Sequence, residues 1–489
     1  MAVYAEREDT VTLTIINEAK GYGSEADSSQ RLQMQCDTCG RGLPLSISRK
    51  AVSLDCPSID CSGRMRASSP SRVGFTCFLS FQAKREDTYI PPFLPVFRFS
   101  IASENYARMI DQVADIEVAL ARFYPDKKRR VLDAIQAVGE QVATMDRNLQ
   151  ETFDYILEST YDSFVIFTND ASLPWHWSYS PKQRVFVLDR YPCGTIFVDR
   201  VEDTLTRFRK LRNRTLNPRQ VFTSRQEALR GHSVIMLHPD PAGCADDKLA
   251  YARKEKERIL SLLTVPQDPD DPAVFSAENI YCIPAPSDSK WSEFSPREQI
   301  AAITAQEAVR KGLEIIHFTG HIKSAVGRDE LNNECEIPVL QLGPNEDSCI
   351  RADDIQGAYL ESEPLVFLNG CSSGHISDLW NKSASLATAL LNRGAAGCVV
   401  TTGSVFDRSG FELAEYFYSS LLQCPESLTF GKALLAARRQ MAMLDQDDPM
   451  RLMFHFYGDP GGRLIYTSPP DSALELICGT TLQEDAEDR

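Results

Sequence analysis

The sequence predicts an α/β protein with a mostly parallel sheet flanked by helices, preceded by an N-terminal β-rich module and a helical connector. Beyond residue 160, short apolar runs such as SFVIFTND, HSVIMLHPD and PLVFLNGC alternate with helical stretches, which is typical of parallel strands joined by helices. Between about residues 102 and 159, apolar residues recur at three- and four-residue spacing and indicate helices. The first ninety residues are β-prone and interrupted by Ser and Gly.

Length and composition limit the classes of protein that fit. A chain of 489 residues predicts two or three domains, and 43% apolar residues suffice to build their cores. A net charge of −16 argues against direct nucleic-acid binding, which needs clustered Lys and Arg. The sequence shows no run of about 18 apolar residues and no signal peptide, so we expect no membrane segment and a cytoplasmic location. The 14 cysteines are then expected to be thiols, metal ligands or nucleophiles.

The expected elements follow the chain in order. Alternating residues predict strands at Thr10–Asn17 and Gly74–Phe81. Two helical stretches separated by Pro125 predict an α-hairpin packed on the next domain. Within the α/β part, helices are expected at Asp246–Leu263 and Glu298–Lys311. We therefore divide the chain into a β-rich module at 1–95, a helical connector at 96–160, an α/β domain at 161–468 and an acidic tail at 469–489.

A cluster of cysteines lies in the first region, in the segment CDTCGRGLPLSISRKAVSLDCPSIDC. Cys36 and Cys39 form a CxxC pair, and Cys56 and Cys61 follow as a looser pair. Four thiolates in two such pairs suit a tetrahedral structural zinc site. We predict one Zn²⁺ bound by these four cysteines in a zinc-ribbon module that serves for docking or as a scaffold. A redox dithiol at Cys36 and Cys39 is the alternative.

Two of the predicted strands have polar residues at their carboxyl ends. Functional residues of an open parallel sheet lie at these ends. Cys371 follows PLVFLNG and precedes SSG, so small neighbours leave its thiol accessible and let backbone N–H groups approach an oxyanion. A thiol needs a base, and imidazole is the natural partner. In LEIIHFTGH, His317 lies inside the strand and should pack beneath a helix, whereas His321 lies beyond Gly320 in the expected loop. The spacing therefore favours His321 as base and Cys371 as nucleophile.

Here the sequence resembles the CHAT family of caspase-like cysteine peptidases, in which one strand ends in HFxxH and another in a Cys flanked by small residues. The resemblance covers roughly residues 130 to 468 and implies a caspase-like sheet. It implies that His321 is the catalytic base, Cys371 the nucleophile and His317 a packing residue of the strand. Further segments resemble the family in the same order: LPWHW, ADDIQGAYLESEPLVFLNGC, SASLATALLNRGAAGCVVTTGSVFD and FYGDP.

The chain departs from the family pattern at two positions. The family usually places Gly directly after the catalytic His, where this chain has Ile322. A backbone N–H serves an oxyanion from either residue, so Ile322, Gly370 and Ser372 are the predicted oxyanion donors. Arg-specific members of the wider clan often have an acid two residues before the Cys, where this chain has Asn369. Asn369 and Asp407 are the candidate substrate-pocket residues, with a solvated loop position as the alternative for Asp407.

The resulting hypothesis is a regulated cysteine endopeptidase that cleaves a protein substrate through a thioester. The resemblance suggests a setting in bacterial, including antiviral, defence or in programmed cell death, with a regulatory protein or ligand acting through the N-terminal module. The alternative is a catalytically silent caspase-like scaffold that binds a protein partner. We interpret His375 as a loop residue and His176 as a packing residue.

Overall fold

The computed structural model describes the following residues: 10–18, 33–36, 42–44, 54–55, 64–68, 72–82, 96–123, 126–170, 172–197, 232–239, 250–265, 274–287, 289–328, 334–351, 354–355, 362–371, 386–387, 389–391, 393–423 and 428–464.

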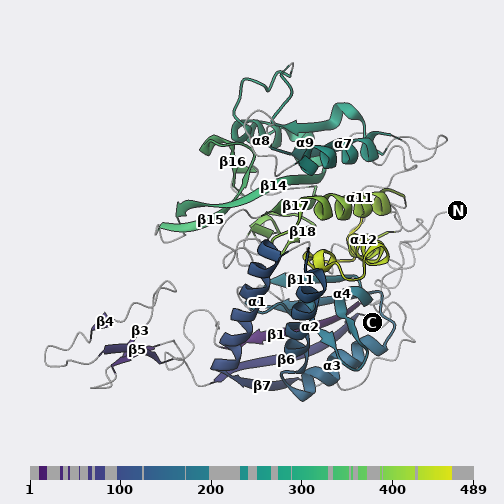
Figure 1. Ribbon diagram of the computed structural model, residues 1–489. Coiled ribbons are helices and arrows are strands. Elements are labelled where there is room, and N and C mark those ends of the chain that lie inside the picture. Colours follow the sequence, from purple (N-terminus) through teal and green to yellow (C-terminus); the bar gives the residue numbers. More distant parts are fainter. Residues whose placement is uncertain are drawn as a thin grey trace, which may run out of the picture.

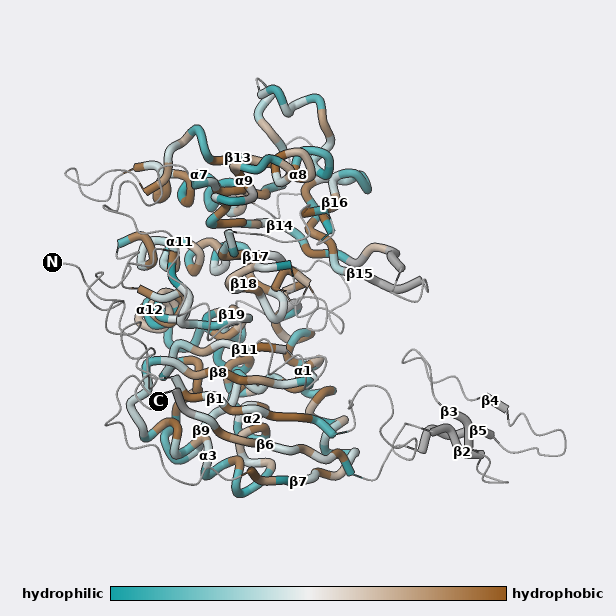
Figure 2. Tube along the Cα trace, turned by 180° about the vertical axis from the view of Figure 1, so that it is seen from behind, coloured by the Kyte–Doolittle hydropathy of each residue, from teal (hydrophilic) through white to brown (hydrophobic). Residues whose placement is uncertain are grey.

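Within these residues, thirteen strands form one mixed sheet. Eleven of them follow one another across the sheet, in the order seen from top to bottom in Figure 2: β13 (Ile280–Ile283), β12 (Ser233–Leu237), β14 (Leu313–Arg328), β17 (Leu365–Cys371), β18 (Gly397–Thr401), β19 (Phe454–Gly458), β11 (Cys193–Phe197), β8 (Ser163–Thr168), β1 (Thr10–Asn17), β6 (Arg72–Gln82) and β7 (Phe97–Ala102). Two more strands, β15 (Glu334–Gln341) and β16 (Cys349–Ile350), branch from β14.

The sheet consists of two parallel blocks joined by one antiparallel contact. Strands β13, β12, β14, β17 and β18 run parallel to one another. Strand β19 is antiparallel to β18 and parallel to β11, which begins the second block with β8 and β1. Strands β6 and β7 complete the sheet in antiparallel pairing. Because β8, β12, β18 and β19 are buried along their whole length, their apolar runs fit central strands covered on both faces.

Helices cover the sheet, as Figure 1 shows. Those of the connector are α1 (Ser103–Phe123), α2 (Lys128–Thr144) and α3 (Arg147–Glu158), and those of the α/β part are α4 (Val187–Arg190), α7 (Ala250–Thr264), α8 (Pro296–Thr304), α9 (Glu307–Gly312), α11 (Asp407–Gln423) and α12 (Phe430–Leu444). One face of β14 and β17 shares a core with α7 and α11, and the other face shares a second core with α8 and α9.

Two helices that the sequence predicts as continuous are divided. The second helix of the predicted α-hairpin splits because Asp146 caps a new helix, accepting hydrogen bonds from the backbone N–H groups of Asn148 and Leu149. The predicted helix Glu298–Lys311 is split into α8 and α9. In one continuous helix, two residues six positions apart point about 120° away from each other around the axis. The split instead brings Ile303 and Val309 into the same core.

Two described strands from the first 95 residues belong to the main sheet. The predicted strands Thr10–Asn17 and Gly74–Phe81 are present as β1 and within β6, and β1 pairs in parallel with β8 of the α/β part. Polar contacts add to this pairing, since Asn17 and Tyr106 both donate hydrogen bonds to the carboxylate of Asp170. The sheet therefore crosses both predicted boundaries, at 95 and at 160.

A small antiparallel sheet lies between β1 and β6 in the sequence. Its strand order is β3 (Gly42–Pro44), β2 (Gln33–Cys36), β5 (Arg64–Ser68) and β4 (Leu54–Asp55). Cys36 ends β2, whereas Cys39, Cys56 and Cys61 lie outside the described residues. The described residues hold no group of three or more potential metal ligands, but this search does not reach the predicted zinc site, which stays a prediction.

Candidate active site

The two predicted catalytic residues occupy paired positions in neighbouring strands. Strands β14 and β17 run parallel, with Gly320 opposite Gly370 and His321 opposite Cys371. Neighbouring strands are about 4.8 Å apart, so the backbones of His321 and Cys371 lie next to each other where β17 ends. The His321 side chain is half-buried. The side chain of Cys371 and all of Ser372 and His375 lie outside the described part of the chain.

His321 belongs to a strand, not to the loop that the sequence predicts. Strand β14 continues from Leu313 to Arg328, and beyond Gly320 it pairs with β15, with His321 opposite Gln341. Gly320 has φ of +151°, a conformation that favours glycine. The glycine therefore changes the backbone conformation of β14 without ending the strand, which is why reading Gly320 as the start of a loop was wrong.

Close contact across the two strands explains the glycine before Cys371. A Cβ on Gly370 would lie 2.5 Å from Cγ1 of Ile322 and 2.7 Å from Cδ1. The Ile322 side chain is 3% exposed and belongs to the core on the α8–α9 face. Thr401 of β18 donates a hydrogen bond to the carbonyl oxygen of Gly370 over 3.0 Å. The predicted oxyanion residues Ile322 and Gly370 therefore lie in packed strands directly beside the His–Cys pair.

His317 is buried in a polar network below this pair. Its side chain is fully buried, stacks on Phe367 and has its Nδ1 atom 3.2 Å from the Tyr418 hydroxyl. Its Nε2 atom lies 3.1 Å from Oε1 of Glu255. The predicted position within the sheet, under a helix and with a hydrogen-bond partner, is confirmed.

The Glu255 carboxylate also connects to both strands. Oε2 accepts hydrogen bonds from Nδ2 of Asn369 over 2.6 Å and from Oγ1 of Thr319 over 3.2 Å. Our sequence reasoning missed Glu255, although a signal existed. In α7 the buried residues include Ala252, Glu255 and Ile259, so the glutamate interrupts a helical apolar stripe.

The two candidate pocket residues both contact α7. Asn369 is 5% exposed and its amide donates to Glu255. Asp407 is the first residue of α11, where its Oδ2 accepts a hydrogen bond from the backbone N–H of Tyr251 over 2.8 Å. Burial raises the pKa of Asp407 to about 6; the Tyr251 N–H opposes this rise and the charge of Glu255 adds to it. Asp407 is therefore half-buried and hydrogen-bonded, and a substrate-pocket role for either residue stays a prediction.

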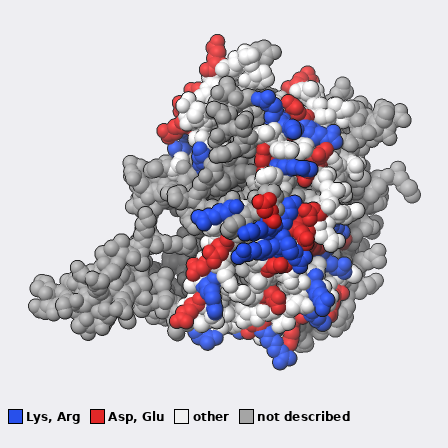
Figure 3. Space-filling model, viewed as in Figure 1, with Lys and Arg blue, Asp and Glu red and all other residues white. Residues whose placement is uncertain are grey.

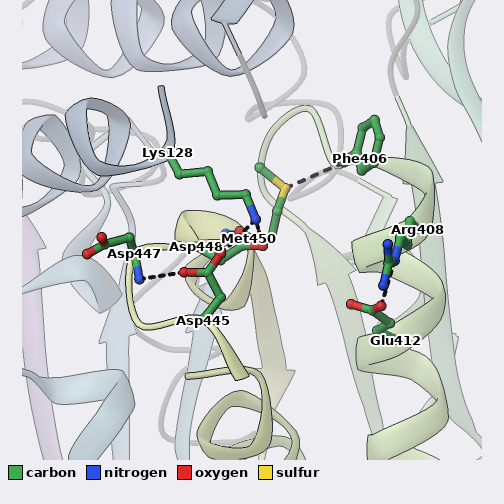
Figure 4. A network of polar contacts seen from close by, with 8 residues as sticks. All are labelled: Lys128, Phe406, Arg408, Glu412, Asp445, Asp447, Asp448 and Met450. Atoms are coloured by element: carbon green, nitrogen blue, oxygen red, sulfur yellow. Dashed lines mark hydrogen bonds and ion pairs between the residues drawn. The ribbon is translucent and has the colours of Figure 1, made fainter. Parts of the chain in front are cut away.

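The segment that leads into α11 is linked to the helical connector, as Figure 4 shows. The Phe406 N–H donates to Sδ of Met450, a residue of the 3₁₀ helix η8 (Pro449–Leu452). Lys128 at the start of α2 contacts Asp445 and Asp448, at 2.8 and 3.2 Å. Figure 3 shows basic and acidic side chains intermixed on the face of the molecule that is seen in Figure 1.

Two further histidines, His176 of the 3₁₀ helix η2 (Trp175–Trp177) and His455 of β19, are buried against each other. His176 stacks on His455 with ring centroids 3.9 Å apart, and His455 contacts the Thr195 hydroxyl at 2.7 Å. Burial, and then the nearby charge of Arg438, hold the pKa of His176 well below its ordinary value. Both rings are buried, in agreement with a packing role for His176.

No helix in the described part of the chain is both long and apolar enough to cross a membrane.

The structure is therefore an α/β protein in which His321 and Cys371 occupy paired positions in two neighbouring parallel strands, where β17 ends. The family profile of the CHAT domain matches residues 168–471, more than half of the chain. The chain therefore belongs to the CHAT domain family.

Among solved structures, three examples align with most of this chain at low sequence identity. The crystal structure of the Arg-specific cysteine proteinase gingipain R aligns with 13% identity and a TM-score of 0.38, covering 74% of this chain and 76% of that one. The complex of the pro- and mature domains of Porphyromonas gingivalis RgpB aligns with 13% identity and a TM-score of 0.39, covering 73% and 76%. The Saccharomyces cerevisiae separase–securin complex aligns with 14% identity and a TM-score of 0.32, covering 76% of this chain and 21% of that one. No curated protein matches the sequence.

Proposed function

We propose that this chain is a cysteine endopeptidase in which His321 is the general base and Cys371 the nucleophile. The observation that carries the proposal is the pairing of His321 with Cys371 across β14 and β17. Membership of the CHAT domain family supports it, because the motifs around His321 and Cys371 resemble those of caspase-like cysteine peptidases. The substrate is accordingly a protein.

The proposed reaction proceeds through a thioester. His321 accepts the thiol proton, and the Cys371 sulfur attacks the peptide carbonyl carbon. Backbone N–H groups of Ile322, Gly370 or Ser372 hold the resulting oxyanion. When the C–N bond breaks, the amine leaves with the proton from His321. Water, deprotonated by His321, then hydrolyses the thioester and releases the acid.

The test compares the wild type with the single variants His321→Ala and Cys371→Ala. Each should abolish cleavage of a casein or proteome-derived substrate while the free energy of unfolding stays within about 1 kcal/mol. Because the two residues act as a unit, the double variant should be hardly worse than either single variant. An iodoacetamide probe at neutral pH should label Cys371 before the other non-metal thiols.

The alternative class, a scaffold without chemistry, makes the opposite prediction. In that case Cys371 reacts no faster than an ordinary thiol, and no cleavage occurs with every native partner present. The wider setting in bacterial, including antiviral, defence or programmed cell death rests on the family resemblance alone. Identifying new protein termini in cells that express the active and the Cys371→Ala forms would show the substrates.

The zinc site forms a separate part of the proposal. Cys36, Cys39, Cys56 and Cys61 would hold one Zn²⁺ with sulfur distances near 2.3 Å, and the support is their paired spacing in the sequence. The resulting module would dock a regulatory protein or ligand. Elemental analysis should find one zinc per chain after removal of loosely bound metal, and Cys36→Ser should lose it. A metal-free wild-type protein would contradict the site.

A further inference from the structure

A buried carboxylate lies under the proposed catalytic pair. Glu255 is fully buried in α7. Removing a carboxylate from water is unfavourable by several kcal/mol unless charges or hydrogen bonds compensate. A side chain that only fills space at this position would be apolar, as its neighbours in the stripe are. The contacts of this carboxylate therefore indicate its role.

These contacts reach the two strands at matching positions. Thr319 and Asn369 are paired across β14 and β17, and both donate to Oε2 of Glu255. Each lies two residues before a member of the proposed dyad, which corresponds to about 7 Å along a strand. One carboxylate oxygen thus joins the two strands one step below His321 and Cys371.

The surrounding donors fit an ionised carboxylate. Thr319 and Asn369 both donate to it, and an ionised carboxylate only accepts hydrogen bonds. Burial, and then the charge of Glu255, hold the pKa of Tyr418 well above its ordinary value, so the Tyr418 hydroxyl keeps its proton and can donate it to Nδ1 of His317. Nε2 of His317 lies 3.1 Å from Oε1 of Glu255.

The site is also closed behind Asn369. A Cβ on Gly410 of α11 would lie 2.6 Å from Oδ1 of Asn369. The amide is therefore held between the backbone of α11 and the carboxylate on α7. Asp407, at the start of α11, accepts from the first turn of α7 and fixes the two helices to each other.

We propose that Glu255 is a positioning residue for the His321–Cys371 pair. Its carboxylate holds the ends of β14 and β17 in register through Thr319 and Asn369 and places a fixed negative charge beneath the two reacting groups. This inference rests on the proposed dyad and adds to it a residue that touches neither reacting atom.

The charge has an effect that a purely structural role does not have. A negative charge raises the pKa of a nearby thiol and of a nearby imidazolium, so its removal moves both titrations to lower pH. Taking about 7 Å, the rise of two residues along a strand, as the scale of the separation, and an effective dielectric constant of about 20, the shift is on the order of 1–2 pH units. The titratable groups that face Glu255 are His317 from β14, Tyr418 from α11 and Asp407 at the start of α11.

The experiment measures the rate of Cys371 alkylation by iodoacetamide as a function of pH, with the modified peptide quantified by mass spectrometry. The measurement needs no substrate. Because iodoacetamide is uncharged, removing the charge of Glu255 changes little how readily the reagent approaches Cys371. Glu255→Gln keeps the shape of the side chain and removes the charge, and the midpoint should move down by about 1–2 pH units. Tyr418→Phe is the matched control, since it disturbs the network at His317 and keeps the carboxylate; its midpoint should stay at the wild-type value. Asp407→Asn removes the titration of Asp407, so the variant shows how much of the pH dependence of alkylation comes from this neighbour.

The outcomes separate this inference from the proposed dyad. If His321→Ala moves the midpoint up to that of an ordinary thiol while a folded Glu255→Gln leaves it unchanged, the role of Glu255 is refuted and the dyad stands. If His321→Ala itself has no effect, the dyad fails. Should Glu255→Gln not fold, the double variant Glu255→Met with Thr319→Val replaces the carboxylate by apolar groups of similar volume and carries the same expectation.

Discussion

At the scale of single residues, His317 and His321 share one strand and differ in their surroundings. His317 is fully buried among Glu255, Phe367 and Tyr418, whereas His321 is half-buried beside Cys371. Four residues along a strand bring both side chains to the same face. What separates their roles is the depth of the helix cover, because α7 and α11 enclose His317.

This difference predicts opposite effects of the two alanine variants. His317→Ala should lower the free energy of unfolding by about 3 kcal/mol, because it leaves a cavity and removes a buried hydrogen bond. Protein that still folds should retain part of its alkylation rate at Cys371. Urea unfolding measures the first effect, with His321→Ala as the control that keeps stability. A wild-type stability for His317→Ala would contradict the buried network.

Asp407 predicts a pH dependence of stability. Burial raises its pKa in the folded protein from 3.8 to about 6, so between these values the folded state binds the proton more tightly than the unfolded state. The stabilisation from its protonated form is complete below about pH 4 and disappears as the pH rises through about 6. Asp407→Asn keeps an acceptor for the Tyr251 N–H and removes this titration. Unfolding free energies measured from pH 4 to 7 should favour the variant increasingly as the pH rises; parallel curves would refute the shift.

At the scale of elements, the contact between β14 and β17 positions the site. These strands pair over seven residue positions, from Ile315 opposite Leu365 to His321 opposite Cys371. Glycines at 320 and 370 lie directly before the dyad, and the Ile322 side chain occupies the space that a side chain at 370 would need. The fit of the two strands therefore depends on one missing methyl group.

Gly370→Ala should accordingly lower the free energy of unfolding by about 1–3 kcal/mol, because the added Cβ overlaps Ile322. It should also slow alkylation of Cys371, since the strands must separate at the dyad. Gly403→Ala is the control, because its added Cβ would lie 3.3 Å from Sδ of Met453, a tight contact that a shift of a few tenths of an ångström relieves. Combining Gly370→Ala with Ile322→Ala should give a smaller loss than the sum of the two single variants; strict additivity would contradict the contact.

At the scale of the whole molecule, the cysteine-rich segment is an insertion in a hairpin of the main sheet. β1 ends at Asn17, which pairs with Phe75 of β6. The segment of the chain between β1 and β6 contains the small sheet and the predicted zinc ligands. Removing residues 1–95 would also remove β1 and β6 and uncover β8. Removing the insertion alone would leave the main sheet complete.

Replacing residues 20–71 by a short Gly-rich turn should therefore give a folded protein. Its thermal stability and the Cys371 alkylation profile should match those of the full chain, and any activation that depends on the zinc module should disappear. The comparison is a deletion of residues 1–95, which should aggregate or unfold because it removes the strands paired with β8 and β7. A folded and fully regulated replacement variant would refute the regulatory role of the module.

Much of the fold could be predicted because short runs of apolar residues indicate which segments of the chain are buried. The apolar runs that end in HFTGH and NGC are typical of strands covered on both faces. The parallel block, with β14 beside β17, confirms this prediction. Two helix breaks and the course of β14 beyond Gly320 could not be predicted, because pairing with β15 and packing on the sheet decide them.

By itself, the sequence determined the α/β class, the family and the two residue types at the strand ends. Only the tertiary structure decided that the N-terminal strands extend the sheet, that His321 lies within β14 opposite Cys371 of β17, and that Glu255 joins the two strands. The physical reason is distance along the chain. Glu255 is 64 residues from Thr319 and 114 from Asn369, and no local pattern records which buried donors will meet a carboxylate once three separate elements have packed.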